Sequence, residues 1–277
     1  MSETPSGELA IFLPDEFSPE HKDAVLRYLQ EGATFSLIER SLAFEGFDML
    51  RQAVVYLRGV SLSFASIYES LVEQRFADSF IESLLKAEDI ARFSERLRAL
   101  MARQIINALK DRGYFRQDVP ASQFLMGYCL YWWYSFSKGY AFEIEIFRDL
   151  ASAGIVFESH DLFSPQGRRS KHDLVVSSFR GDVKTSTYFL HTSRTATLRS
   201  DFYITQIIGR ERKLAKVVFL RKSFWDEING ETFHSTVALL PHVLPKPTLI
   251  IHHGVPWVVI DYALWKEKIF FNQKQER

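Results

Sequence analysis

The sequence has 277 residues, of which 47% are hydrophobic and 25% charged, which is ordinary for a globular protein of one large or two smaller domains. Its formal net charge is zero, which argues against a chain that binds nucleic acid over its whole surface. The single cysteine, Cys129, excludes an internal disulfide and a cysteine-based zinc site. It fits a reducing compartment, so we expect a cytoplasmic protein.

The sequence indicates neither secretion nor membrane insertion. The N-terminal segment MSETPSGELA has no basic region followed by an apolar run. The most apolar stretch, residues 124–137, is shorter than the roughly 20 residues that a spanning helix needs. We therefore expect no membrane contact, and we interpret this stretch as a buried core helix.

Residues 1–138 have the pattern of an all-helical domain, because apolar residues recur at helical spacing and strand-like alternation is absent. Ser36 and Glu39 have the spacing of a capping box, and Gly113 is placed to end a helix. No motif assigns this domain a role, and a helix-turn-helix or a dimerisation module remains open. The predicted helices are 20–30, 46–57, 64–85 and 87–112.

The pattern changes at Gly139, where we place a domain boundary that makes residues 139–277 a second domain. A helix over about 140–153 ends at Gly154, and short runs rich in β-branched residues follow. This order predicts an α/β (α+β) fold with a central mixed sheet flanked by helices. The predicted strands are 155–159, 173–179, 182–190, 202–208, 216–220, 248–251 and 255–260.

Two carboxylates and a lysine converge in the segment HDLVVSSFRGDVKTS, residues 172–186. Asp182 and Lys184 share one face of their strand because side chains alternate between faces. A hairpin turn at 179–181 would bring Asp173, at the start of the preceding strand, to within a residue or two of Lys184. Carboxylates held this close require a cation, and a hard divalent metal ion would supply it.

A third acidic ligand is expected from the helix before the sheet, where Glu143 and Glu145 are the candidates. Glu143 shares the apolar face of this helix with Ile146, Phe147 and Leu150. A carboxylate on a packing face needs a partner, and a metal ion would provide one. Glu145 lies on the opposite face, where we expect a surface pair with Arg148.

The order of helix glutamate, aspartate, hairpin and Asp-x-Lys resembles the PD-(D/E)xK nuclease superfamily, over roughly residues 139–225. His172 stands in place of the family's proline, and Asp182 is an accepted variant of its glutamate. The resemblance implies a restriction-endonuclease-like domain that hydrolyses phosphodiester bonds in DNA as an Mg²⁺- or Mn²⁺-dependent endonuclease. It implies Glu143, Asp173 and Asp182 as metal ligands, with Lys184 as the fourth catalytic residue.

The segment 161–222 is basic, with 13 lysines and arginines against 5 acidic residues, which favours an anionic partner such as DNA. Arg168, Arg169 and Lys171 are candidate phosphate contacts, although they also fit a solvated loop. His160, His172 and His191 fit structural roles better than catalytic ones. The alternative function is a non-catalytic nucleic-acid- or protein-binding module that retains the nuclease fold. The sequence also leaves open whether the protein forms a homodimer.

Overall fold

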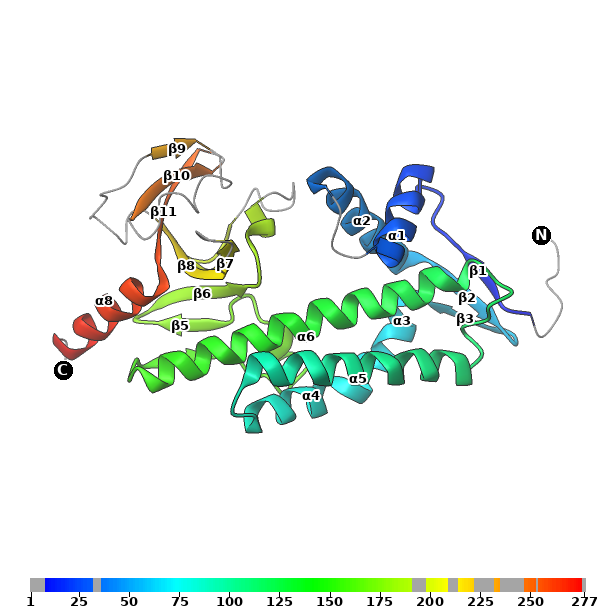
Figure 1. Cartoon of the computed structure of the whole chain (residues 1–277), viewed down its shortest axis with the longest axis horizontal. Helices are drawn as coiled ribbons and strands as arrows, with labels where there is room; N and C mark the ends of the chain where they lie inside the picture. Colours follow the sequence, from blue (N-terminus) through cyan, green and yellow to red (C-terminus); the bar gives the residue numbers. More distant parts are fainter. Residues whose placement is uncertain are drawn as a thin grey trace. The chain divides into compact units, whose positions relative to one another are not determined.

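The structure is a computed structural model that divides into two units, Met1–Lys138 and Gly139–Arg277. The division falls inside one long helix, α6 (Ser122–Ser152), which replaces the two helices that the sequence predicts there (Figure 1). The residues that the structure describes are 8–31, 36–190, 198–208, 214–221, 232–234, 247–252 and 254–275.

The first unit is mainly helical, as the sequence predicts. The capping box of Ser36 and Glu39 is confirmed, and it begins α2. The predicted helix over 64–85 is also confirmed, with a π-helical turn (Glu69–Glu73) that joins α3 to α4. The helices are α1 (Pro19–Glu31), α2 (Leu37–Met49), α3 (Phe64–Tyr68), α4 (Gln74–Lys86) and α5 (Ile90–Asp111).

A small antiparallel sheet in the first unit contradicts the prediction that strands are absent before residue 139. Its order is β1 (Ala10–Phe12), β2 (Val54–Leu57) and β3 (Val60–Ser63). The predicted helix over 46–57 is therefore wrong beyond Gln52, because a 3₁₀ turn (Leu50–Gln52) follows α2 and β2 follows that turn. Arg58 and Gly59 have φ angles of 52° and 80°, which is the conformation of a two-residue hairpin turn between β-branched segments.

In its described residues, the second unit forms an eight-stranded sheet of mostly antiparallel strands, which confirms the predicted mixed sheet. The pairs β6–β7 and β9–β10 are parallel, and the other neighbours are antiparallel. In spatial order the strands are β4 (Phe157–Ser159), β5 (Leu174–Val176), β6 (Phe179–Lys184), β7 (Phe202–Ile208), β8 (Leu214–Arg221), β11 (Val255–Asp261), β10 (Thr248–His252) and β9 (Thr232–His234).

The hairpin between β5 and β6 turns two residues earlier than predicted. Its turn is Ser177–Ser178, whose φ angles of 47° and 70° are those of a two-residue hairpin loop, and Val176 pairs with Phe179. The predicted turn at 179–181 is thus wrong, because those residues already belong to β6. The predicted strand over 182–190 ends at Lys184, and a 3₁₀ turn covers Thr187–Leu190.

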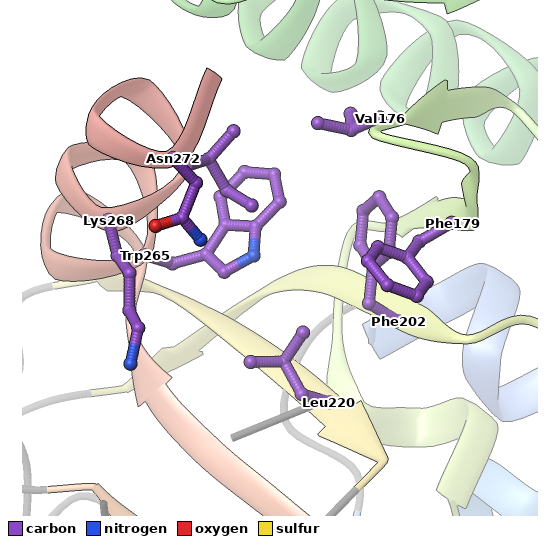
Figure 2. A pocket seen from close by; sticks show the side chains of 8 residues that line it. Val176, Phe179, Phe202, Leu220, Trp265, Lys268 and Asn272 are labelled. Atoms are coloured by element: carbon purple, nitrogen blue, oxygen red, sulfur yellow. The ribbon is translucent and has the colours of Figure 1, made fainter. Parts of the chain in front are cut away.

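A C-terminal helix, α8 (Tyr262–Gln275), covers one face of this sheet and was not predicted. Its Trp265 lies 5.3 Å from Phe202, ring centre to ring centre. Between α8 and the sheet lies a pocket of about 480 Å³, counting its open mouth, with Val176 and Phe179 on its far wall (Figure 2). The predicted flanking of the sheet by helices is therefore confirmed, with α8 and the second half of α6 as the helices.

Strand register separates this pocket from the acidic residues of β6. Gly181 pairs with Phe202, which lines the pocket, so Gly181 belongs to that face. Asp182 is the next residue along β6 and pairs with Tyr203. Because side chains alternate along a strand, Asp182 points to the opposite face of the sheet. Gly181 is needed here because a Cβ at this position would lie 2.1 Å from Cζ of the Phe202 ring.

Candidate metal centre

Three potential metal ligands from three different elements converge in the second unit. Glu143 lies on α6, His160 directly follows β4, and Asp173 directly precedes β5. One ligand atom from each side chain lies within 4.8 Å of the other two. The pairing of β4 with β5 explains two of the positions, since the His160 amide donates to the Asp173 carbonyl at 3.0 Å.

The imidazole of His160 is held from several sides. Two rings of α6 contact it: Tyr140 stacks on it at 6.4 Å, and Phe147 meets it edge-on at 6.3 Å, measured between ring centres. Its Nε2 meets Oε1 of Glu143, and its Nδ1 lies 2.9 Å from the carbonyl oxygen of Gly167. The orientation of the ring is therefore fixed by α6 and by the loop after β4.

These contacts determine which nitrogen of His160 carries the proton. A carbonyl oxygen only accepts hydrogen bonds, so Nδ1 is the donor to Gly167. In the neutral ring, Nε2 then directs a lone pair at the carboxylate of Glu143, and these two acceptors need a nearby cation to offset their repulsion. Histidines that bind metals commonly donate their second ring nitrogen to a backbone carbonyl in this way. The donor set therefore fits a divalent ion.

Without such an ion, protonation of Nε2 would supply the positive charge. Burial lowers the pKa of His160, but the hydrogen bond and the negative charge of Glu143 outweigh it and leave the pKa raised. Glu143 itself is buried, with 6% of its surface exposed, as the prediction from the apolar helix face required. An ionised carboxylate at this depth needs a cationic partner of some kind.

Asp182 and Lys184 lie next to this group. Nζ of Lys184 donates to Oδ1 of Asp182 at 2.7 Å, and the Val183 amide donates to Oδ2 of Asp173 at 2.7 Å. Burial raises the pKa of Asp182, and its hydrogen bond with Asp173 raises it further, to about 7. Burial lowers the pKa of Lys184, but the nearby carboxylates, Asp182 foremost, outweigh it and raise the pKa.

The structure thus brings the four predicted site residues close together, and it adds His160 to them. Glu143 and Asp173 belong to the close group of three potential ligands, and Asp182 contacts Asp173 and Lys184 outside that group. His160 takes the third place in the group. Asp182 as a metal ligand stays a prediction.

Sequence reasoning missed His160 as a potential ligand because the ring is placed by long-range contacts. The signal was the position of His160 directly after a strand that pairs with the strand following Asp173. Ser159 pairs with Leu174, so the residues just beyond them lie opposite each other. That register is not encoded in the spacing of the two residues along the chain.

Glu145 has a partner that the sequence did not predict. Nζ of Lys216, on β8, lies 2.5 Å from Oε1 of Glu145, where we expected Arg148 as the partner. One turn further along α6, Asp149 receives a hydrogen bond from Lys266 of α8 at 2.5 Å. The polar face of α6 is therefore tied to the sheet and to α8 rather than only to solvent.

The three residues predicted to contact phosphate, Arg168, Arg169 and Lys171, differ from one another in their contacts and exposure. Nη1 of Arg168 donates to the carbonyls of Leu162 and Phe163 at 3.1 and 3.2 Å, so this guanidinium holds the loop before β5. Arg169 and Lys171 are exposed. Of the other residues considered, His172 contacts Ser200 Oγ at 3.0 Å, and His191 lies outside the described residues.

Comparison of the chain with protein-family models, with curated proteins and with solved structures gives no match. Among the residues that the structure describes, none of the helices combines the length and the apolarity that a membrane span requires.

Proposed function

We propose that this protein is a metal-dependent nuclease that hydrolyses phosphodiester bonds in DNA. Glu143, His160 and Asp173 would bind the ion, with Lys184 beside them. The observation that supports the proposal is the orientation of His160, which donates through Nδ1 to a carbonyl and turns Nε2 toward a buried carboxylate. A carboxylate–imidazole–carboxylate set next to a lysine is the chemistry expected of such a site.

The donor set favours a transition-metal ion over Mg²⁺ alone. Two carboxylates suit Mg²⁺ and Mn²⁺ alike, whereas an imidazole nitrogen is a softer ligand that binds transition metals more readily. We therefore expect Mn²⁺ to bind more tightly than Mg²⁺ and both ions to support activity.

The bound ion, Lys184 and Asp182 would have separate roles in the proposed reaction. A bound divalent ion would supply a Lewis acid for a phosphoryl oxygen and for the attacking water. Lys184 holds its ammonium where it can donate to a phosphate oxygen and offset the negative charge that develops in the transition state. Asp182 positions that ammonium through the hydrogen bond of 2.7 Å.

The direct test is incubation of the purified chain with supercoiled, linear, branched and single-stranded DNA, each with Mg²⁺, with Mn²⁺ and with EDTA. We expect cleavage of at least one form that depends on the metal. Glu143→Gln should abolish it, because the buried carboxylate at the imidazole is lost.

Glu145→Gln is the matched control, since it makes the same chemical change two residues along the same helix. Its carboxylate pairs with Lys216 instead, and it should cleave at close to the parent rate. Equal loss of activity in both variants would contradict the assignment. Metal-independent DNA binding without cleavage would favour the non-catalytic binding module.

A further inference from the structure

Helix α5 of the first unit carries basic side chains along one face. Arg92, Arg96, Arg103 and Lys110 follow one another at spacings of four, seven and seven residues. At 3.6 residues per turn these positions fall within an arc of about 40° around the helix. We call these four residues the α5 basic stripe.

The stripe faces away from the core of the first unit. Ser94, Met101 and Ile105 are buried on the opposite side of α5, whereas all four stripe residues are exposed. Asn107, about 20° beyond the edge of this arc, is exposed as well. Within the described part of the chain, no ion pair involves the three arginines of the stripe, so their charges are available to a partner.

This concentration of charge contrasts with the rest of the unit. Residues 1–138 hold 15 basic and 19 acidic side chains, so the unit is acidic as a whole. The helix α5 itself holds five basic residues and two acidic ones, Glu95 and Asp111. Neither acidic residue lies within the arc of the stripe. An arrangement of this kind directs an anionic partner to one face.

A hollow between α4 and α5 lies beside the C-terminal part of the stripe, on the adjoining side of α5. Arg75 and Arg112 line it, together with the amides of Gln104 and Asn107 and the carboxylate of Asp111. Guanidinium and amide groups are common donors to phosphate oxygens. With two guanidinium groups against one carboxylate, the hollow adds positive charge to the stripe.

We propose that the α5 basic stripe binds the phosphate backbone of duplex DNA. From Arg92 to Lys110 the helix advances about 27 Å, at 1.5 Å per residue. A single small anion cannot contact charges distributed over that length, whereas a DNA strand presents one phosphate about every 3.4 Å. The choice of DNA rests on the proposed nuclease function, but binding by the stripe does not require cleavage.

The test is the salt dependence of DNA binding by the whole chain in EDTA, measured by fluorescence anisotropy with a labelled duplex of 30 base pairs. The stripe variant combines Arg92→Gln, Arg96→Gln and Arg103→Gln. Glutamine has a helix propensity close to that of arginine, and circular dichroism should stay near that of the parent. We expect roughly 10²–10³-fold weaker binding near 0.1 M salt and a salt slope lower by roughly 2 to 3, at ~0.9 per phosphate contact.

The matched control combines Lys22→Gln, Arg51→Gln and Arg58→Gln, three exposed residues of the same unit off α5. It removes the same three charges and should keep the slope of the parent. An unchanged slope in the stripe variant, or an equal fall in both variants, would overturn the proposal. So would a parent chain that binds anionic phospholipid vesicles and not the duplex. If the parent chain binds DNA through the stripe but cleaves no DNA, the nuclease function is refuted and the DNA-binding role of the stripe is not.

Discussion

Lys184 is the cation at the edge of a cluster of carboxylates, and its contribution to chemistry can be separated from its contribution to folding. Lys184→Ala should keep metal binding and circular dichroism, because the carboxylates remain to bind the ion. The cleavage rate should fall by ~10²–10³, as is usual when charge stabilisation of a transition state is lost. Lys184→Arg should restore activity only in part, since a planar fork replaces a point charge.

Lys216→Ala is the control for this measurement in a single-turnover assay. It also removes a lysine paired with a carboxylate, but that partner is Glu145, outside the centre. Its cleavage rate should match the parent's. If Lys184→Ala cleaves DNA as fast as Lys216→Ala, Lys184 has no role in the reaction.

The pKa of Asp182 has a consequence for the stability of the metal-free protein. The pKa is raised in the fold from 3.8 to about 7 by burial and by Asp173. Between these values the folded state binds more protons than the unfolded state, so stability falls as the pH rises. We expect a loss of at most about 4 kcal/mol between pH 4 and pH 7 in EDTA.

Urea unfolding at a series of pH values would measure this loss. Asp182→Asn removes the titrating group and should flatten the pH dependence over this range. Saturating Mn²⁺ should flatten it as well, because the ion offsets the negative charge. A stability that rises from pH 4 to pH 7 in EDTA would show that Asp182 is ionised at little cost.

At the scale of secondary structure elements, the position of β6 depends on Gly181. The Phe202 ring occupies the space of a side chain at this position, and a Cβ would lie 2.1 Å from Cζ. Gly181→Ala should therefore force the ring or β6 to move, with a destabilisation of about 1–3 kcal/mol in urea unfolding. Since Asp182 and Lys184 follow on the same strand, metal affinity should fall as well.

Gly139→Ala is the matched control for this element. Gly139 lies inside α6, and a Cβ there would meet nothing within 4 Å. Alanine in a helix is favoured over glycine by roughly 0.5–1 kcal/mol, so this variant should be at least as stable as the parent. If Gly181→Ala is equally stable, the close packing against Phe202 is not required.

The elements that the sequence predicted well are those whose signal is local. The amphipathic pattern of α5 and the capping box of α2 depend on residues three or four apart. The small sheet of the first unit was missed because β1 pairs with a strand more than forty residues away, as in the pair Ala10 and Tyr56. Helix α8 was missed because its aromatic residues give it no clear apolar face.

For the whole molecule, the mixed α+β fold with a helical first half could be predicted from composition and periodicity. The buried glutamate of the centre was also predictable, because helix geometry alone separates Glu143 from Glu145. The third member of the ligand group was not, since His160 reaches the centre through the pairing of β4 with β5 and through ring contacts with α6. The register of β4 against β5 determines the position of His160, and the spacing of residues along the chain does not reveal that register.

The most direct test of the central claim is pulsed electron paramagnetic resonance of Mn²⁺ bound to the purified chain. The proposed centre predicts one bound ion with a magnetic coupling to the nitrogen of His160, whose Nε2 faces the carboxylates. His160→Gln should remove that coupling. The control variant His172→Gln should keep it, because the His172 ring is hydrogen-bonded to Ser200. Bound Mn²⁺ without nitrogen coupling in the parent, or no bound ion at all, would contradict the proposed centre.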